Sequence, residues 1–378
     1  MLTEKQQEDN SFPKWVDKNN KKLACIPNMS NSKKSTDTKK IDNQKATIAG
    51  LNTEIVTHVC KRCNRTFNLR AKDLAYLSSN SECIFHWGKL RNVRVDKVIE
   101  HKYSCCSGGM DSDGCEVGKH VYDGDYNGNG NGLNLAGYIQ VDENTTSDEY
   151  KTSQNVYALD CEMCYTTKGL EVTRISIVDI HLNEIYESLV KPDTQILDYN
   201  TRWSGLTEES LRNCNKKLKH VQADLMKLFN KDTILIGHSL DSDFKAIKLI
   251  HTNIIDTSVV FPHKMGPPYK RALRNLMSEY LQKIIQEDVE GHDSKEDAAA
   301  CISLMIWKIN EDLRSKKFAN ILNQPDSRSN QSNNSLLNKN STSTFNINNI
   351  SSSNANLGNQ RNLTITNNKM NMPKIASK

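Results

Sequence analysis

The hydrophobic positions divide the chain into a patterned middle and polar ends. Residues 154–313 hold all the long hydrophobic periods. Short apolar or alternating runs predict five strands, at residues 156–163, 172–180, 184–191, 233–238 and 254–261. Apolar residues at helical spacing predict helices at residues 218–229, 241–250, 271–285 and 294–313. Three successive strands followed by alternating helices and strands predict an α/β fold, in which helices cover a mixed sheet.

The rest of the chain predicts a small second domain, a linker and two tails. Residues 55–122 are rich in Cys and His, and residues 123–153 have the composition of a Gly- and Asn-rich linker. Residues 1–54 are polar and lysine-rich, and residues 314–378 are dominated by Asn, Ser and Thr. Neither end has enough apolar surface to offset the entropy of ordering, so we expect both to be disordered.

Charge and cysteine content narrow the class of protein. The 378 residues carry a formal net charge of +5, which allows a polyanionic partner without requiring one. No apolar run approaches the roughly 18 residues of a membrane span, and the N-terminus lacks the apolar core of a signal peptide. We therefore expect an intracellular protein with no membrane partner, whose eleven cysteines are metal ligands or core thiols rather than disulfides.

Two acids end the first predicted strand. Asp160 and Glu162 lie two residues apart, so a strand points both side chains to one face. Two carboxylates in one partly buried place repel each other, and a hard divalent cation such as Mg²⁺ relieves that repulsion. The alternative is an ordinary solvated strand end. The apolar run before Asp160 favours the cation site.

Four more polar residues precede or begin predicted helices. Asp241 and Asp243 follow the fourth predicted strand, at the carboxyl end where α/β sheets place their sites. One of them is a ligand candidate and the other a helix cap, a role that we assign to Asp241. His292 and Asp297 flank the start of the last predicted helix. Their alternatives are a surface histidine and the acid of a variant capping box.

These motifs resemble, in this order, those of the DEDDh 3′-to-5′ exonucleases. They are DCEM at residues 160–163, GHSLDSDFKAIK at residues 237–248 and HDSKED at residues 292–297. The sequence around them, over residues 154–313, resembles the RNA exonuclease 1 homologue branch, near the yeast Rex-type enzymes. The resemblance implies an RNase H-like fold with a mixed five-stranded sheet. It also selects Asp243 over Asp241.

The resemblance further implies a reaction and its residues. Asp160, Glu162, Asp243 and Asp297 would hold two Mg²⁺ or Mn²⁺ ions, and His292 would be the general base. The implied substrate is an RNA 3′ end, from which hydrolysis releases 5′-mononucleotides. The expected setting is nuclear RNA processing or turnover, with the cytoplasm as the alternative location.

Candidate substrate contacts lie in two segments. The resemblance implies that Met163, Trp203 and Leu206 line the pocket for the terminal nucleotides. Core packing is the alternative for Met163 and Leu206. Basic residues of a later segment are candidates for phosphate contacts, with a solvated helix face as the alternative: Lys264, Lys270, Arg271 and Arg274.

Cysteine and histidine spacing in residues 55–122 predicts a zinc module. The candidate ligands are Cys60, Cys63, Cys83, His86, Cys105, Cys106, Cys115 and His120. Eight ligands fill two tetrahedral structural zinc sites. The segment has too few apolar residues to fold unaided, so zinc binding would supply the missing folding free energy. Disulfides and scattered reactive thiols are the alternatives. The segment resembles the matching region of the same exonuclease branch and a CHORD module. Its CxxC replaces the wider first spacing of that module, so ligand pairing stays open and His58 is an alternative ligand.

Two other functions use the same residues. A DNA 3′-to-5′ exonuclease would share the motifs, and a catalytically inactive protein would bind RNA or protein through the same fold. The complete five-residue set favours an active enzyme, and the branch resemblance favours RNA. A protein partner would bind through the zinc module or the tails. The sequence makes no prediction of the oligomeric state.

Overall fold

The structure, a computed structural model, describes residues 1–18, 21–27, 44–48, 51–124, 136–141, 155–287 and 291–322. These residues belong to one unit, Met1–Leu322. The predicted tail beyond residue 322 and most of the predicted linker lie outside the described residues. Within the described ranges, no helix is both long and apolar enough to cross a membrane.

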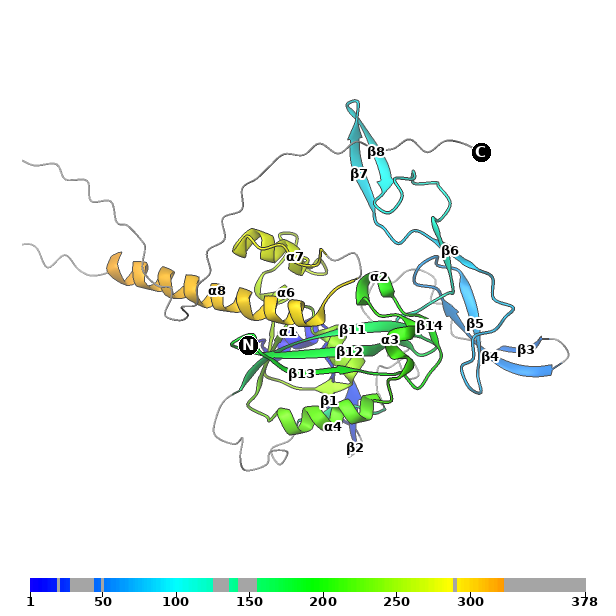
Figure 1. Ribbon diagram of the computed structural model, residues 1–378, viewed down its shortest axis with the longest axis horizontal. Helices are drawn as coiled ribbons and strands as arrows, with labels where there is room; N and C mark the ends of the chain where they lie inside the picture. The colour runs from blue at the N-terminus through cyan, green and yellow to red at the C-terminus, as the bar shows by residue number, and fades with distance from the viewer. Residues whose placement is uncertain are drawn as a thin grey trace, which may run out of the picture. The chain divides into compact units, whose positions relative to one another are not determined.

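A mixed sheet forms the centre of the fold (Figure 1). Its strands are β11 Val156–Thr166, β12 Gly169–Asp179, β13 Glu184–Leu189, β14 Ile196–Asp198, β15 Ile234–Gly237 and β17 Ile254–Asp256. The main path has the order β13-β12-β11-β15-β17, and β14 pairs with β11. β12 is antiparallel to both neighbours, whereas β15 is parallel to β11 and β17. The predicted α/β class with an RNase H-like mixed sheet is confirmed, with the short β14 as an additional strand.

Helices cover both faces of this sheet (Figure 1). They are α2 Thr201–Ser204, α3 Glu208–Arg212, α4 Leu218–Leu228, α5 Asp241–Ile247, α6 Thr257–Val260, α7 Leu273–Leu276, the π-helix η3 Met277–Leu281 and α8 Ser294–Leu322. Leu159 of β11 packs with Phe244 of α5 on one face. The adjacent Ala158 packs with Ala298 of α8 on the other face. Strand alternation therefore assigns even-numbered residues of β11 to the α8 side.

Residues 1–18 and 21–27 are ordered, contrary to the disorder predicted for residues 1–54, of which residues 19–20, 28–43 and 49–50 lie outside the described residues. They form α1 Glu4–Asp9 and the hairpin of β1 Lys14–Lys18 with β2 Lys21–Cys25. Leu2 and Phe12 are buried in the core on one face of the central sheet, where Phe12 meets Phe244 edge-on with ring centroids 5.7 Å apart. Thr3 and Gln6 form a capping box that starts α1. Isolated apolar residues without a period were enough to dock this segment.

Other predicted boundaries also need correction. The strand predicted at residues 254–261 ends at Asp256, because the Asp256 carboxylate accepts the N–H of Ser258 and starts α6. The last helix continues to Leu322 and not to residue 313. Inside the predicted linker, β10 Ile139–Gln140 pairs with β16 Leu249–Ile250.

The Cys/His module is built from short strands, and its first sheet starts at Gln44, ahead of the predicted boundary at residue 55. They are β3 Gln44–Ile48, β4 Leu51–Val59, β5 Thr66–Arg70, β6 Cys83–Phe85, β7 Leu90–Val95, β8 Val98–Tyr103 and β9 Glu116–Gly118. β3, β4 and β5 form one sheet, whereas β6 pairs with β9 and β7 with β8. Its buried core is small and includes Phe67, Leu69 and Phe85 beside the buried thiols of Cys60 and Cys83. So small a core matches the expectation that this module needs metal to fold.

Candidate nuclease site and Cys/His clusters

Asp160 and Glu162 share the α8 face of the central strand β11. They follow Ala158 at the period of two, as the sequence predicted. A β-bulge between Glu162 and Met163 ends this regular alternation directly after the second acid. Glu162 is only 7% exposed, so at least one of these carboxylates is drawn into the structure rather than solvated.

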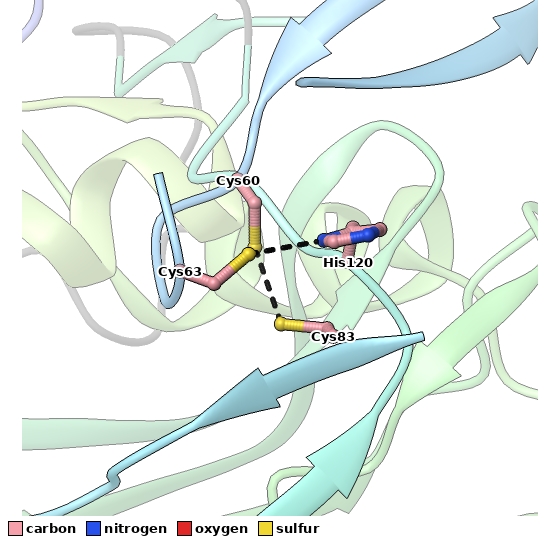
Figure 2. Close-up of side chains that lie close together, drawn as sticks. All are labelled: Cys60, Cys63, Cys83 and His120. Carbon is pink, nitrogen blue, oxygen red and sulfur yellow. Dashed lines mark hydrogen bonds between the residues drawn. The ribbon is translucent and has the colours of Figure 1, made fainter. Parts of the chain in front are cut away.

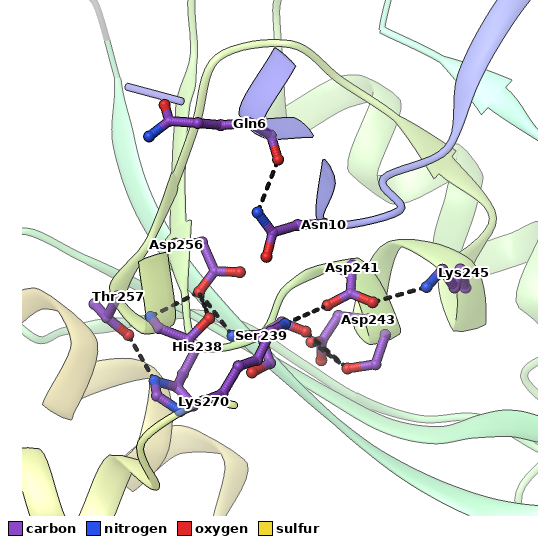
Figure 3. A network of polar contacts seen from close by, with 12 residues as sticks. Gln6, Asn10, His238, Ser239, Asp241, Asp243, Lys245, Asp256, Thr257 and Lys270 are labelled. Atoms are coloured by element: carbon purple, nitrogen blue, oxygen red, sulfur yellow. Dashed lines mark hydrogen bonds and ion pairs between the residues drawn. The ribbon is translucent and has the colours of Figure 1, made fainter. Parts of the chain in front are cut away.

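Asp243 and Asp241 lie in the first turn of α5 but have different surroundings (Figure 3). Asp243 is 3% exposed, and its Oδ1 accepts the N–H of Cys161 on β11 at 2.9 Å. Asp241 instead pairs with Lys245 at 2.7 Å and Lys270 at 2.9 Å. The helix cap is Leu240, so the predicted capping role of Asp241 is wrong. Asp243 is thereby tied to the strand that carries the first two acids.

Asp297 and His292 complete the group from the start of α8. The His292 Nδ1 lies 3.9 Å from Asp297 Oδ2, to which Gln286 Nε2 also donates at 2.8 Å. The Asp297 Oδ1 is buried and has no hydrogen-bond partner among the described residues. At the start of α8 the Asp293 carboxylate accepts the N–H of Lys295. The helix start is therefore capped by Asp293, and not by the variant capping box that was the alternative role for Asp297. Sequence reasoning missed Gln286, because no motif includes it.

The four acids, here called the carboxylate site, all have raised pKa values. Burial comes first, and it lifts the pKa of Asp160 well above its usual range together with repulsion from Asp243, Asp297 and Glu162. Burial followed by repulsion from Asp297 raises the pKa of Glu162 to about 8. Burial likewise raises the pKa of Asp243 to about 7 and that of Asp297 to about 6. Asp160 feels all three other members and is therefore the electrostatic centre of the site.

His292 has the opposite shift. Burial lowers its pKa, and the positive charge of Arg274 lowers it further. An imidazole shifted in this direction is neutral near pH 7 and able to accept a proton.

The predicted substrate contacts divide into exposed and buried residues. Trp203 is 44% exposed, lies edge-on to the His292 ring at 5.6 Å, and accepts the His292 N–H with its carbonyl at 2.7 Å. Leu206 is 1% exposed, which favours the core-packing alternative over a contact with a nucleotide. Met163 is partly buried and packs against the core. Lys270 pairs with Asp241 and Arg271 with Glu279, so both basic side chains already have acidic partners.

The eight predicted zinc ligands form two separate clusters. The first cluster is Cys60, Cys63, Cys83 and His120, and the second is His86, Cys105, Cys106 and Cys115. In each cluster the ligand atoms all lie within 4.8 Å of one another. His58 belongs to neither, because its ring stacks on Tyr122 at 4.1 Å. This settles the grouping that the sequence left open: the second cluster is nested in the chain between Cys83 and His120 of the first.

The first cluster is the more buried of the two (Figure 2). The Cys63 Sγ lies 3.3 Å from His120 Nδ1, and the Cys60 Sγ lies 3.6 Å from the Cys83 Sγ. Burial raises the pKa of Cys60, but backbone N–H groups directed at its sulfur outweigh that effect and lower the pKa to about 6. A thiolate stabilised in this way is ready to bind a metal cation.

Arg62 joins the first cluster to the central sheet. It lies between Cys60 and Cys63, and its guanidinium pairs with Asp198 of β14 at 2.6 Å. The same guanidinium lies 4.5 Å from the ring centroid of Phe85 and 5.1 Å from that of Tyr165. Sequence reasoning missed this contact, because a single arginine inside a CxxC loop has no distinguishing pattern.

The chain is similar in sequence to several named proteins. It is 48% identical over 259 residues to RNA exonuclease 1 homolog of Homo sapiens, which is 68% of this chain and 20% of that protein. It is 47% identical over 165 residues to RNA exonuclease 1 of Saccharomyces cerevisiae, 43% of this chain and 30% of that one. The chain is a homologue of these RNA exonucleases. The predicted resemblance to the RNA exonuclease 1 homologue branch is confirmed.

The relatives are much longer than the matched region. The chain spans less than a third of the human and yeast proteins. An alignment of 259 residues is longer than residues 154–313, so the similarity to the human homologue extends beyond that range. Among solved structures, the Pan2 catalytic unit of Neurospora crassa aligns with a TM-score of 0.40 at 26% identity, covering 46% of this chain and 30% of that one. No family model matches the chain.

Proposed function

We propose that the chain is a metal-dependent 3′-to-5′ exoribonuclease that releases 5′-mononucleotides. The observation that carries this proposal is the convergence of four carboxylates with raised pKa values beside His292. The named RNA exonuclease relatives support the same reaction class. Nuclear RNA processing is the proposed setting, supported by the resemblance and the N-terminal lysine clusters.

The donor set fits divalent cations with a preference for oxygen. Asp160, Glu162, Asp243 and Asp297 would hold two Mg²⁺ or Mn²⁺ ions. Their raised pKa values record a repulsion that bound cations would offset. The buried Asp297 Oδ1 has no partner among the described residues and offers a free lone pair. Bound cations would supply an activated water and stabilise the departing 3′ oxygen.

The chain's own residues would handle the proton and the terminal nucleotide. His292 is neutral near pH 7, so its imidazole can take the proton from the attacking water. Its position is fixed by the backbone hydrogen bond to the Trp203 carbonyl and by the nearby Asp297 carboxylate. The exposed Trp203 ring beside it offers a surface on which a terminal base can stack.

The two Cys/His clusters fit structural zinc. Each offers four soft or borderline ligands within 4.8 Å of one another, which is a complete tetrahedral set with no position left for a substrate. We therefore assign no chemistry to them, and propose that they bind two zinc ions and hold the module together.

Labelled RNA tests direction, metal dependence and sugar preference together. With Mg²⁺, a 5′-labelled single-stranded RNA should give a ladder of shortening products, whereas a 3′-labelled RNA should give labelled mononucleotide at once. Matched DNA should be degraded more slowly. Internal fragments, or undiminished activity without Mg²⁺ or Mn²⁺, would refute the mechanism. If DNA is degraded faster than RNA, the proposed substrate changes from RNA to DNA. A protein that degrades neither with Mg²⁺ and Mn²⁺ supplied would favour the non-catalytic alternative.

A further inference from the structure

A row of three aromatic rings runs from the second Cys/His cluster to His292. Trp87 directly follows the cluster residue His86, and its ring meets Trp203 edge-on with centroids 6.2 Å apart. Trp203 in turn meets His292 edge-on at 5.6 Å. Trp87 is 36% exposed and Trp203 is 44% exposed, so both indoles present ring surface to solvent beside the candidate general base.

Residues next to the second-cluster ligands hold this row in place. The Arg202 guanidinium lies 4.0 Å from the centroid of the Trp87 ring, where a cation is attracted to the π-face. Arg202 also pairs with Glu116 at 3.0 Å, and Glu116 directly follows the cluster residue Cys115. Two ligand-adjacent residues of the module therefore contact α2, the helix that carries Trp203.

The segment that follows Trp87 has the charge of a nucleic-acid-binding surface. Between residues 89 and 103, which include the hairpin of β7 and β8, five basic side chains outnumber two acidic ones. Four of the five basic residues are exposed: Lys89, Arg91, Arg94 and Lys97. Exposed aromatic rings beside a basic strand pair are the features that bind single-stranded nucleic acid through base stacking and phosphate contacts.

We propose that the Cys/His module supplies a substrate-binding residue, Trp87, which stacks on a base of single-stranded RNA whose 3′ end lies at His292. The RNA upstream of the terminal nucleotide passes over Trp203 and Trp87 and onto the basic hairpin. This inference rests on the proposed exoribonuclease function and adds a second binding region to it. A protein partner for the same surface is the competing outcome, which the excess of basic charge disfavours.

The test compares RNA length in the full chain with zinc present. Trp87→Leu should raise KM for a single-stranded octanucleotide by about tenfold, because one base loses its stacking partner. It should leave kcat, and KM for a dinucleotide, roughly unchanged. Trp87→Phe should restore most of the affinity. Ile84→Ala removes another exposed apolar side chain of the same module and should behave as the unchanged chain.

The outcomes separate this inference from the proposed function. If the unchanged chain hydrolyses neither RNA with Mg²⁺, the nuclease proposal fails. If it hydrolyses both and Trp87→Leu leaves the octanucleotide KM unchanged, only the role of Trp87 is overturned. If Trp87→Leu loses zinc, the double variant with the exposed substitutions Arg91→Ala and Arg94→Ala tests the proposal instead. In a plot of log KM for the octanucleotide against log salt concentration, its slope should be smaller by about 1.4, and an unchanged slope overturns the proposal.

Discussion

The carboxylate site and the Cys/His clusters both gather metal-binding residue types, but the fold holds them differently. In each Cys/His cluster four ligand atoms lie within 4.8 Å of one another. Among the described residues, no three of the acids form so tight a group. The acids instead remain in mutual repulsion, with pKa values raised by burial and by one another.

This difference separates metal that builds structure from metal that performs chemistry. A closed set of four soft ligands satisfies its ion and leaves no position for a substrate. An open set of carboxylates that is strained by its own charge gains stability when cations and a phosphodiester arrive. The comparison predicts that substitutions in the carboxylate site change rate more than stability, whereas those in the clusters do the reverse.

The largest expected effect comes from Asp243→Ala. Losing one carboxylate ligand should lower kcat on RNA by about a thousandfold, since metal ligands supply several kcal/mol of transition-state stabilisation. The free energy of unfolding should change little, because relief from burying a carboxylate offsets the loss of the hydrogen bond from the Cys161 N–H. Single-turnover kinetics and thermal unfolding measure the two effects.

Asp241→Ala is the matched control for that substitution. It lies two residues away in the same helical turn but pairs with lysines. It should keep at least about a tenth of the activity, since it leaves the carboxylate site intact. Equal losses in the two variants would contradict the assignment of Asp243.

The next effect concerns the two clusters. Cys60→Ser in the buried first cluster should remove about one zinc per chain and lower the free energy of unfolding by about 4 kcal/mol. Cys115→Ser in the exposed second cluster should also remove about one zinc, with a smaller loss of stability and a larger rise in KM for long RNA. Zinc analysis, thermal unfolding and KM together would show whether the two clusters differ as their burial implies.

The sequence predicted which residues gather at both kinds of site because their patterns are local. Alternation in β11 assigned Asp160 and Glu162 to one face, and Cys spacing identified all eight cluster residues. The nested grouping of those eight residues depends on how β6 meets β9, which spacing does not encode.

Contacts between distant segments were the least predictable. Leu2 and Phe12 are two isolated apolar residues in a polar stretch, yet they are buried against the core. Leu206 looked like a nucleotide contact because of its neighbours in sequence, whereas tertiary packing buries it. Trp87 had no motif, and only the fold shows that it lies beside Trp203.

The pH dependence of stability, an effect of intermediate size, distinguishes the carboxylate site from the clusters. The folded pKa values of Glu162 and Asp243, about 8 and about 7, lie above those of the unfolded chain. The folded chain therefore binds more protons than the unfolded chain, and its stability falls as pH rises through these values. With zinc bound and Mg²⁺ absent, Tm should fall between about pH 6.5 and about pH 8.5.

Mg²⁺ sharpens that measurement. Cations bind the deprotonated acids, so the rise in Tm on adding Mg²⁺ should be larger at the upper end of this range. Above about pH 7.5 the histidines with lowered pKa are neutral in both states and do not compensate, whereas near pH 6.5 their protonation in the unfolded chain makes the fall in Tm shallower. A Tm that rises with pH in the absence of Mg²⁺ would contradict the repulsion among these acids.

The smallest effect tests whether the first cluster is fastened to the nuclease domain. Arg62→Met keeps an unbranched apolar stem but removes the guanidinium, and with it the ion pair with Asp198 and the contacts with two aromatic rings. It should lower the free energy of unfolding by about 1 kcal/mol, because the pair is partly buried. Arg70→Met is the matched control, since its pair with Asp73 lies on the surface of the same module and should contribute nothing measurable. Equal Tm changes for the two variants would mean that Arg62 acts like any surface charge, and the first cluster would then stabilise only its own module.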